Sequence, residues 1–143
     1  MNKVARISGR LSTAIVVAAV FGLAAAAEMS GTKVTLSGAQ EVPPVTTTAS
    51  GSGNIVVGAD KSVSGSVTTS GIAGTAAHIH EAAAGSNGPV IIPLAKSSDN
   101  VWSVPAGSKL SDAQYDNYKA GKLYVNVHSA AHKDGEIRGQ IKQ

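Results

Sequence analysis

The sequence predicts an all-β domain: an antiparallel, Greek-key-like sandwich or barrel of about eight strands with one short helix. Gly, Ser and Thr are abundant, and Val and Ile carry most of the larger apolar side chains. Turn-forming residues recur about every 8 to 12 positions, a spacing typical of short strands in a sandwich or barrel. We expect the strands at residues 33–38, 53–58, 62–70, 75–81, 89–94, 101–104, 123–128 and 136–142.

The clearest strand pattern lies in residues 63–68, where Val or Gly alternates with a hydroxyl side chain. An alternation of period two places one set of side chains on the core face and the other outside. The turn sequence at residues 58–61 precedes this strand, which predicts a hairpin with the strand before it. Residues 123–128 alternate in the same way.

One segment departs from the β pattern. Ser111 and Gln114 are spaced as a capping box, and Gly121 suits the left-handed position that follows a helix C-terminus. We therefore expect a short helix over residues 112–120. Because caps report on structure and not on function, we interpret this helix as a connector covering the open end of the sandwich.

The N-terminus has the pattern of a signal peptide. Three basic residues precede an apolar run over residues 11–26, and small residues follow it. This predicts a signal peptide over residues 1–27, cleaved after Ala26 or Ala27, and one β domain over residues 28–143. A retained membrane anchor is the alternative, but the run is short for a span of about 20 residues. The expected product is a periplasmic or secreted protein with no membrane span.

Charge and cysteine content exclude several classes. Three of the twelve basic residues lie in the leader, so nine remain against nine acidic residues. A neutral surface with few aromatic residues argues against nucleic-acid binding, which needs a basic face or stacking side chains. The chain has no Cys, so an exported domain must be held by its core alone or by a core plus a metal.

The four histidines are the most informative chemical feature: His78, His80, His128 and His132. Side chains alternate on a strand, so His78 and His80 project from one face, with Cα atoms about 7 Å apart. Ile79 then faces the core. His128 ends another strand, and His132 follows in a loop. If the two strands approach each other, three or four imidazoles could surround one metal ion, and imidazole sites suit copper and zinc.

Two interpretations of the histidines stay open at this point, because the sequence does not say whether the pair His78 and His80 lies near the pair His128 and His132. They are either metal ligands or ordinary surface residues. If they bind metal, Glu81, Asp134 and Glu136 are candidate partners for the ring N–H groups. We find no catalytic residues: a nucleophile elbow, a phosphate-binding glycine loop and a metalloprotease helix are all missing from the sequence.

The segment over residues 36–45 contains Glu41 followed by two prolines at positions 43 and 44. Proline cannot donate to a β ladder, so a strand must stop there or become an edge. Glu41 is either a buried hydrogen-bond acceptor or a solvated loop charge, and we favour a structural role. The single Trp102 we assign to the core.

Residues 36–45, 77–80, 126–129 and 135–141, in this order, resemble the CHRD domain, the module named after chordin. Chordin-like proteins repeat this domain, whereas many bacterial members carry one copy behind a signal peptide. The resemblance implies an extracellular β domain. The His-x-His strand and the later histidine are also distantly similar to copper/zinc superoxide dismutase, which implies His78, His80 and His128 as copper ligands.

Three hypotheses follow. The first is an exported CHRD-domain protein that binds a transition metal, preferably copper, without catalysis, with His132 as a fourth ligand. The second is a metal-free adhesion or interaction module with an envelope or extracellular protein partner. The third is a dismutase-like enzyme, which the sequence disfavours because it lacks disulfide cysteines and a zinc-binding subloop rich in His and Asp.

Overall fold

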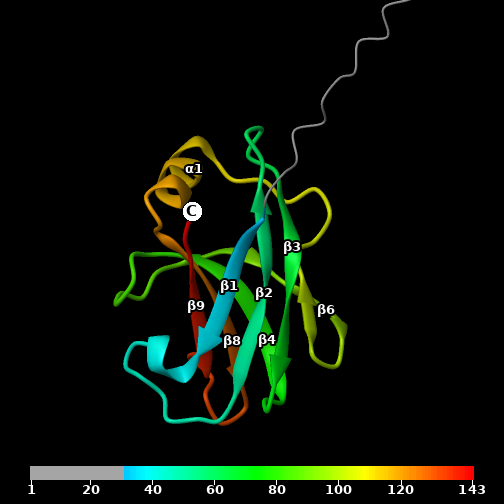
Figure 1. Ribbon diagram of the computed structural model, residues 1–143, viewed down its shortest axis with the longest axis vertical. Coiled ribbons are helices and arrows are strands. Elements are labelled where there is room, and N and C mark those ends of the chain that lie inside the picture. Colours follow the sequence, from blue (N-terminus) through cyan, green and yellow to red (C-terminus); the bar gives the residue numbers. More distant parts are fainter. Residues whose placement is uncertain (1–30) are drawn as a thin grey trace, which may run out of the picture.

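The computed structural model describes residues 31–143 and has an all-antiparallel β fold, as predicted (Figure 1). Nine strands form one continuous sheet in this part of the chain, with one short α-helix. The signal peptide predicted for residues 1–27 lies outside the described residues. In chain order the elements are β1 (Thr32–Ser37), the 3-10 turn η1 (Gly38–Gln40), β2 (Ser50–Val57), β3 (Val63–Ser70), β4 (Gly74–Glu81), β5 (Val90–Pro93), β6 (Ala95–Ser98), β7 (Val101–Ser103), α1 (Asp112–Lys119), β8 (Leu123–Ser129) and β9 (Ile137–Ile141).

The strand order shows how the sheet curls into a nearly closed barrel. It runs β5-β4-β8-β9-β1-β2-β3-β7-β6. β5 and β6 lie at its two ends, yet only Leu94 separates them in the chain. This short connection brings the two edges of the sheet together. Neighbours such as β4 and β8 are distant in the sequence, so their pairing decides which side chains meet on the outer face.

All eight predicted strands are present close to their expected bounds. β2 and β3 form the predicted hairpin, in which the Lys61 N–H donates to the Gly58 carbonyl at 2.9 Å. The ninth strand, β6, was not predicted. All four of its residues are exposed, so it carries no apolar alternation that could have revealed it.

The inward-facing positions of the strands form one apolar core. On β8, Leu123, Val125 and Val127 are at most 1% exposed, and Trp102 is buried as predicted. Burying one such aliphatic side chain contributes about 1.5–3 kcal/mol. The core can therefore hold the domain in a chain without cysteines.

The outer side of β8 and β9 is also buried, which is unusual for a barrel with polar side chains outside. Tyr124, Asn126 and Arg138 are each less than 5% exposed. The segments around residues 38–45 and 82–88 lie over them: the first hydrogen-bonds to Asn126 and Arg138, and the second to Tyr124 and Arg138. The candidate site is built at this covered part of the outer face.

The helix α1 has the predicted caps. Ser111 Oγ accepts from the Gln114 N–H at 3.1 Å, and Gln114 Oε1 accepts from the Ser111 N–H at 2.9 Å. Gly121 has φ +72°, the left-handed conformation expected after the helix.

Removing the Ser111 hydroxyl should therefore weaken the domain. We expect Ser111→Ala to lower the free energy of unfolding by about 1 kcal/mol, because the cap satisfies an otherwise unpaired helix N–H. Urea denaturation followed by circular dichroism measures the change. Ser64→Ala, on an exposed position of β3, is the control and should stay within about 0.5 kcal/mol of the unmodified protein. Equal stability of both variants would contradict this role.

Candidate metal centre

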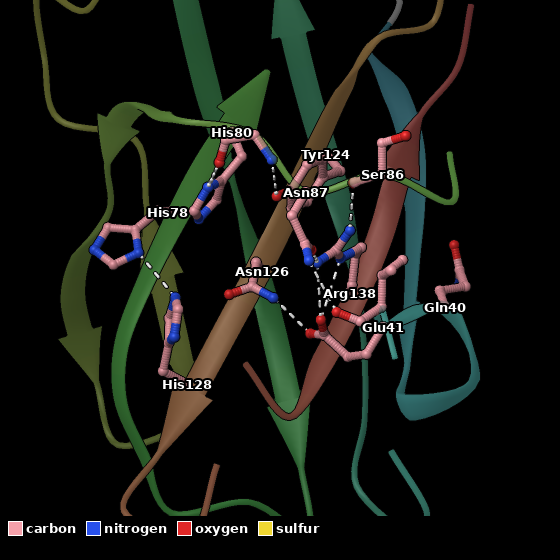
Figure 2. Close-up of polar contacts among 12 residues, drawn as sticks. Gln40, Glu41, His78, His80, Ser86, Asn87, Tyr124, Asn126, His128 and Arg138 are labelled. Atoms are coloured by element: carbon pink, nitrogen blue, oxygen red, sulfur yellow. Dashed lines mark hydrogen bonds and ion pairs between the residues drawn. The ribbon is translucent and has the colours of Figure 1, made fainter. Parts of the chain in front are cut away.

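Three of the four histidines meet on the outer face of the barrel (Figure 2). His78 and His80 lie on β4, with Ile79 between them buried in the core, as the alternation predicted. β4 pairs with β8, and the register places His128 opposite Ala76. His128 is therefore a diagonal neighbour of His78 on the same face.

The three rings offer nitrogen atoms at short separations. His78 Nδ1 lies 3.0 Å from His128 Nε2, and one nitrogen of each ring lies within 4.8 Å of the others. Two ligands of a tetrahedral zinc, each about 2.0–2.1 Å from the ion, are separated by about 3.3 Å. The pair from His78 and His128 is already near that separation, and the remaining separations must shorten when an ion binds.

Backbone carbonyls fix how two of the rings are protonated. His80 Nδ1 lies 2.9 Å from the Gly88 carbonyl oxygen, and His128 Nδ1 lies 2.7 Å from that of Lys133. A carbonyl only accepts, so both Nδ1 atoms donate, and each neutral ring keeps its lone pair on Nε2. His128 Nε2 then accepts from His78 Nδ1.

His80 Nε2 is the anomaly of the cluster. It is buried and has no hydrogen-bond partner among the described residues. A buried polar atom left unpaired typically costs about 1–3 kcal/mol. A metal ion bound to this lone pair would remove that cost.

Burial lowers the pKa of His78 and of His80 below the usual value, and the neighbouring His128 lowers both further. The hydrogen bond to Gly88 acts in the opposite direction on the pKa of His80. Lower values keep both imidazoles neutral at pH 7. The neutral form is the one that binds a metal.

His132 does not join the other three histidines. It lies in the turn between β8 and β9, where it lines a cavity of about 250 Å³ together with Glu41 and Pro43. It is not part of the cluster of possible ligands, and a fourth-ligand role for it stays a prediction.

The carboxylates suggested as partners of the ring N–H groups were assigned wrongly for His80 and His128. Backbone carbonyls take both protons, as described above. Glu136 instead accepts from the Thr47 hydroxyl at 2.7 Å. Backbone acceptors carry no sequence signal, which is why residue types alone did not reveal them.

A buried ion pair lies beside the histidines (Figure 2). Arg138 Nη2 lies 3.1 Å from Glu41 Oε2, and both side chains are less than 5% exposed. Asn126 Nδ2 donates to the other carboxylate oxygen of Glu41 at 2.5 Å. Burial raises the pKa of Glu41, and the charge of Arg138 opposes this rise. The open question about Glu41 is thus answered: it is a buried acceptor.

Sequence reasoning missed Arg138, Asn126 and Tyr124 as parts of this region. The Arg138 guanidinium carbon lies 4.0 Å from the centre of the Tyr124 ring, and Tyr124 stacks on His80 with ring centres 4.9 Å apart. The only available signal was that Asn126 and Arg138 belong to the quoted motif segments. A cavity of about 370 Å³ has His80, Tyr124 and Arg138 in its wall.

None of the helices in residues 31–143 has both the length and the apolar character to cross a membrane. Fold and site together define a small all-β domain with a cluster of three imidazoles on its outer face. A family model of the CHRD domain matches residues 32–141, and the chain belongs to this family. Comparisons with curated proteins and with solved structures gave no significant match.

Proposed function

We propose that this protein is an exported CHRD-domain protein that binds one transition-metal ion through His78, His80 and His128, without catalysis. The observation that carries the proposal is that His78, His80 and His128 each offer one ring nitrogen within 4.8 Å of the others. The buried His80 Nε2, which has no hydrogen-bond partner among the described residues, supports it. Copper is the preferred ion and zinc the alternative. Imidazole accepts both, and the general affinity order of divalent ions favours copper.

The hydrogen bonds of the rings also support a metal site. Histidine ligands in proteins commonly donate their second ring N–H to a carbonyl or carboxylate, which fixes the tautomer and the direction of the lone pair. His80 and His128 both have such a bond. His78 Nδ1 donates to His128 Nε2, so metal binding would break this hydrogen bond. His128 Nε2 would turn its lone pair to the ion, and His78 would bind either through its unprotonated Nε2 or through Nδ1 after its proton has moved to Nε2.

The proposed role is binding or storage of the ion in the periplasm or the medium. The signal-peptide pattern of residues 1–27 supports export. Rapid turnover of a charged substrate would call for electrostatic steering. The exported chain has nine basic and nine acidic residues, so any steering would have to come from a local cluster of charges and not from the net charge.

The test is metal retention by the exported protein. Loaded with equal copper and zinc and then gel-filtered, it should retain about one ion per chain by elemental analysis, with copper in excess. A His78→Ala/His80→Ala variant should retain none, because only one cluster ligand remains. His132→Ala is the matched control, since His132 lies outside the cluster, and it should retain the ion.

Two results would count against the proposal. If the unmodified protein and the double variant both come through gel filtration without metal, the cluster does not bind an ion. If both retain the same amount, the ion binds elsewhere. In the first case the metal-free interaction module becomes the hypothesis to pursue, beginning with capture of envelope proteins.

A further inference from the structure

The loop of residues 82–88 supplies the acceptor that orients His80. The Gly88 carbonyl accepts from His80 Nδ1, while the Gly88 N–H donates to the Tyr124 hydroxyl at 3.2 Å. A Cβ at position 88 would lie 1.9 Å from the Glu81 carbonyl oxygen, so glycine is required for this close approach. Most of the loop is exposed, and its position therefore depends on the contacts that hold it.

Arg138, on β9, hydrogen-bonds to two residues of this loop. Its Nη1 donates to the Ser86 carbonyl at 2.9 Å, and its Nη2 donates to Asn87 Oδ1 at 2.5 Å. The rest of the guanidinium is fixed by Glu41, to which Nε also donates, at 3.2 Å. Arginine has five donors in a rigid planar fork, so this one side chain connects the buried carboxylate to the exposed loop.

Tyr124 connects the same arginine to the histidine. Its ring is nearly parallel to that of His80, at 5°, and the Arg138 guanidinium lies over it. Tyr124 therefore contacts His80 in two ways: directly through its ring, and through its hydroxyl by way of Gly88. Figure 2 shows these side chains leading from Glu41 to the histidines.

We propose that Arg138 and Tyr124 are positioning residues of the candidate metal centre. They hold the loop of residues 82–88 so that the Gly88 carbonyl keeps the His80 proton on Nδ1 and leaves Nε2 free for the ion. The part that concerns the ion rests on the proposed function, whereas the part that concerns the tautomer does not. Loss of the hydrogen-bond partner that orients a metal-ligating histidine typically lowers metal affinity about 10- to 100-fold.

The experiment uses three variants of the exported protein, all of which leave the buried ion pair in place. Tyr124→Phe removes the hydroxyl bound to Gly88 and keeps the stacked ring. Asn87→Ala removes the acceptor of Arg138 on the exposed loop and also the Asn87 Nδ2 donor to the Val42 carbonyl. Asn87→Asp restores the acceptor oxygen alone, so it isolates the contact with Arg138. Tyr118→Phe is the matched control, because Tyr118 on α1 contacts Thr32 and not the histidines.

The first readout is the tautomer of His80 without metal, from long-range ¹H–¹⁵N NMR. We expect an Nδ1–H ring in the unmodified protein, in Tyr118→Phe and in Asn87→Asp, and a mixture of tautomers in Tyr124→Phe and Asn87→Ala. The second readout is affinity for zinc, by competition with a chelator. The same two variants should bind zinc about 10- to 100-fold more weakly.

The two readouts separate this inference from the proposed function. If the unmodified protein binds no metal, the proposed function fails, and the tautomer measurement alone decides whether Arg138 and Tyr124 position His80. If His80 keeps its Nδ1–H tautomer in both Tyr124→Phe and Asn87→Ala, the positioning role is overturned. A changed tautomer with unchanged zinc affinity would overturn the link to the metal centre.

Discussion

Replacing Arg138 by Met is expected to lower the free energy of unfolding by about 3 to 5 kcal/mol. The substitution keeps much of the side-chain volume but leaves the Glu41 carboxylate buried without its cation; Glu41 is 4% exposed. It also removes the donors to Ser86 and Asn87. Urea denaturation of the two proteins at pH 7, followed by fluorescence of Trp102, measures the difference.

The loss of stability should grow with pH. Burial raises the pKa of Glu41 even with Arg138 present, so the folded state binds this proton more tightly than the unfolded state. A raised folded-state pKa makes stability fall as pH rises above the unfolded value. Without Arg138 the pKa rises further, so the variant should lose more stability than the unmodified protein between about pH 4 and pH 7.

A double variant gives the control. Glu41→Gln/Arg138→Met removes both charges, and it should recover part of the lost stability because no charge stays buried without its partner. A single Arg138→Met variant within about 1 kcal/mol of the unmodified protein would show that the ion pair is not the source of stability argued here.

The sequence predicted those parts of the fold that depend on local patterns. Alternation along residues 63–68 and 123–128 located β3 and β8, and the spacing of Ser111 and Gln114 located α1. β6 was not predicted because it is an edge strand, paired only with β7, and all its side chains are exposed. A strand whose side chains are all exposed leaves no periodic apolar signal.

The candidate site likewise has parts that local sequence patterns predict and parts that they do not. The shared face of His78 and His80 follows from the period of a strand, so the sequence alone predicted it. That His128 joins them depends on the pairing of β4 with β8, and Glu41 meets Arg138 across 97 positions of sequence. Such long-range pairings follow from the whole topology. His132 follows His128 by only four residues, yet it lies in the turn between β8 and β9 and lines a cavity together with Glu41.

Copper or zinc is expected to raise the thermal midpoint of the metal-free protein substantially, which tests the proposed function by a second route. An ion that binds only the folded state at about 1,000 times its Kd adds about 4 kcal/mol. For a domain of roughly 100 residues, 1 kcal/mol corresponds to about 4–8 °C. The shift should therefore be on the order of 15–30 °C, measured by circular dichroism with and without the ion.

Two single substitutions, His80→Ala and His132→Ala, decide whether this thermal shift comes from the histidine cluster. His80→Ala removes a ligand, so added metal should leave its midpoint nearly unchanged, whereas His132→Ala should respond like the unmodified protein. Without metal, His80→Ala removes a buried nitrogen that has no partner among residues 31–143, but it also removes the hydrogen bond to the Gly88 carbonyl and the ring stacked on Tyr124. The metal-free midpoint of each variant is therefore measured first, and only the metal-induced shifts are compared. Equal metal-induced shifts in His80→Ala and His132→Ala would place the ion outside the cluster.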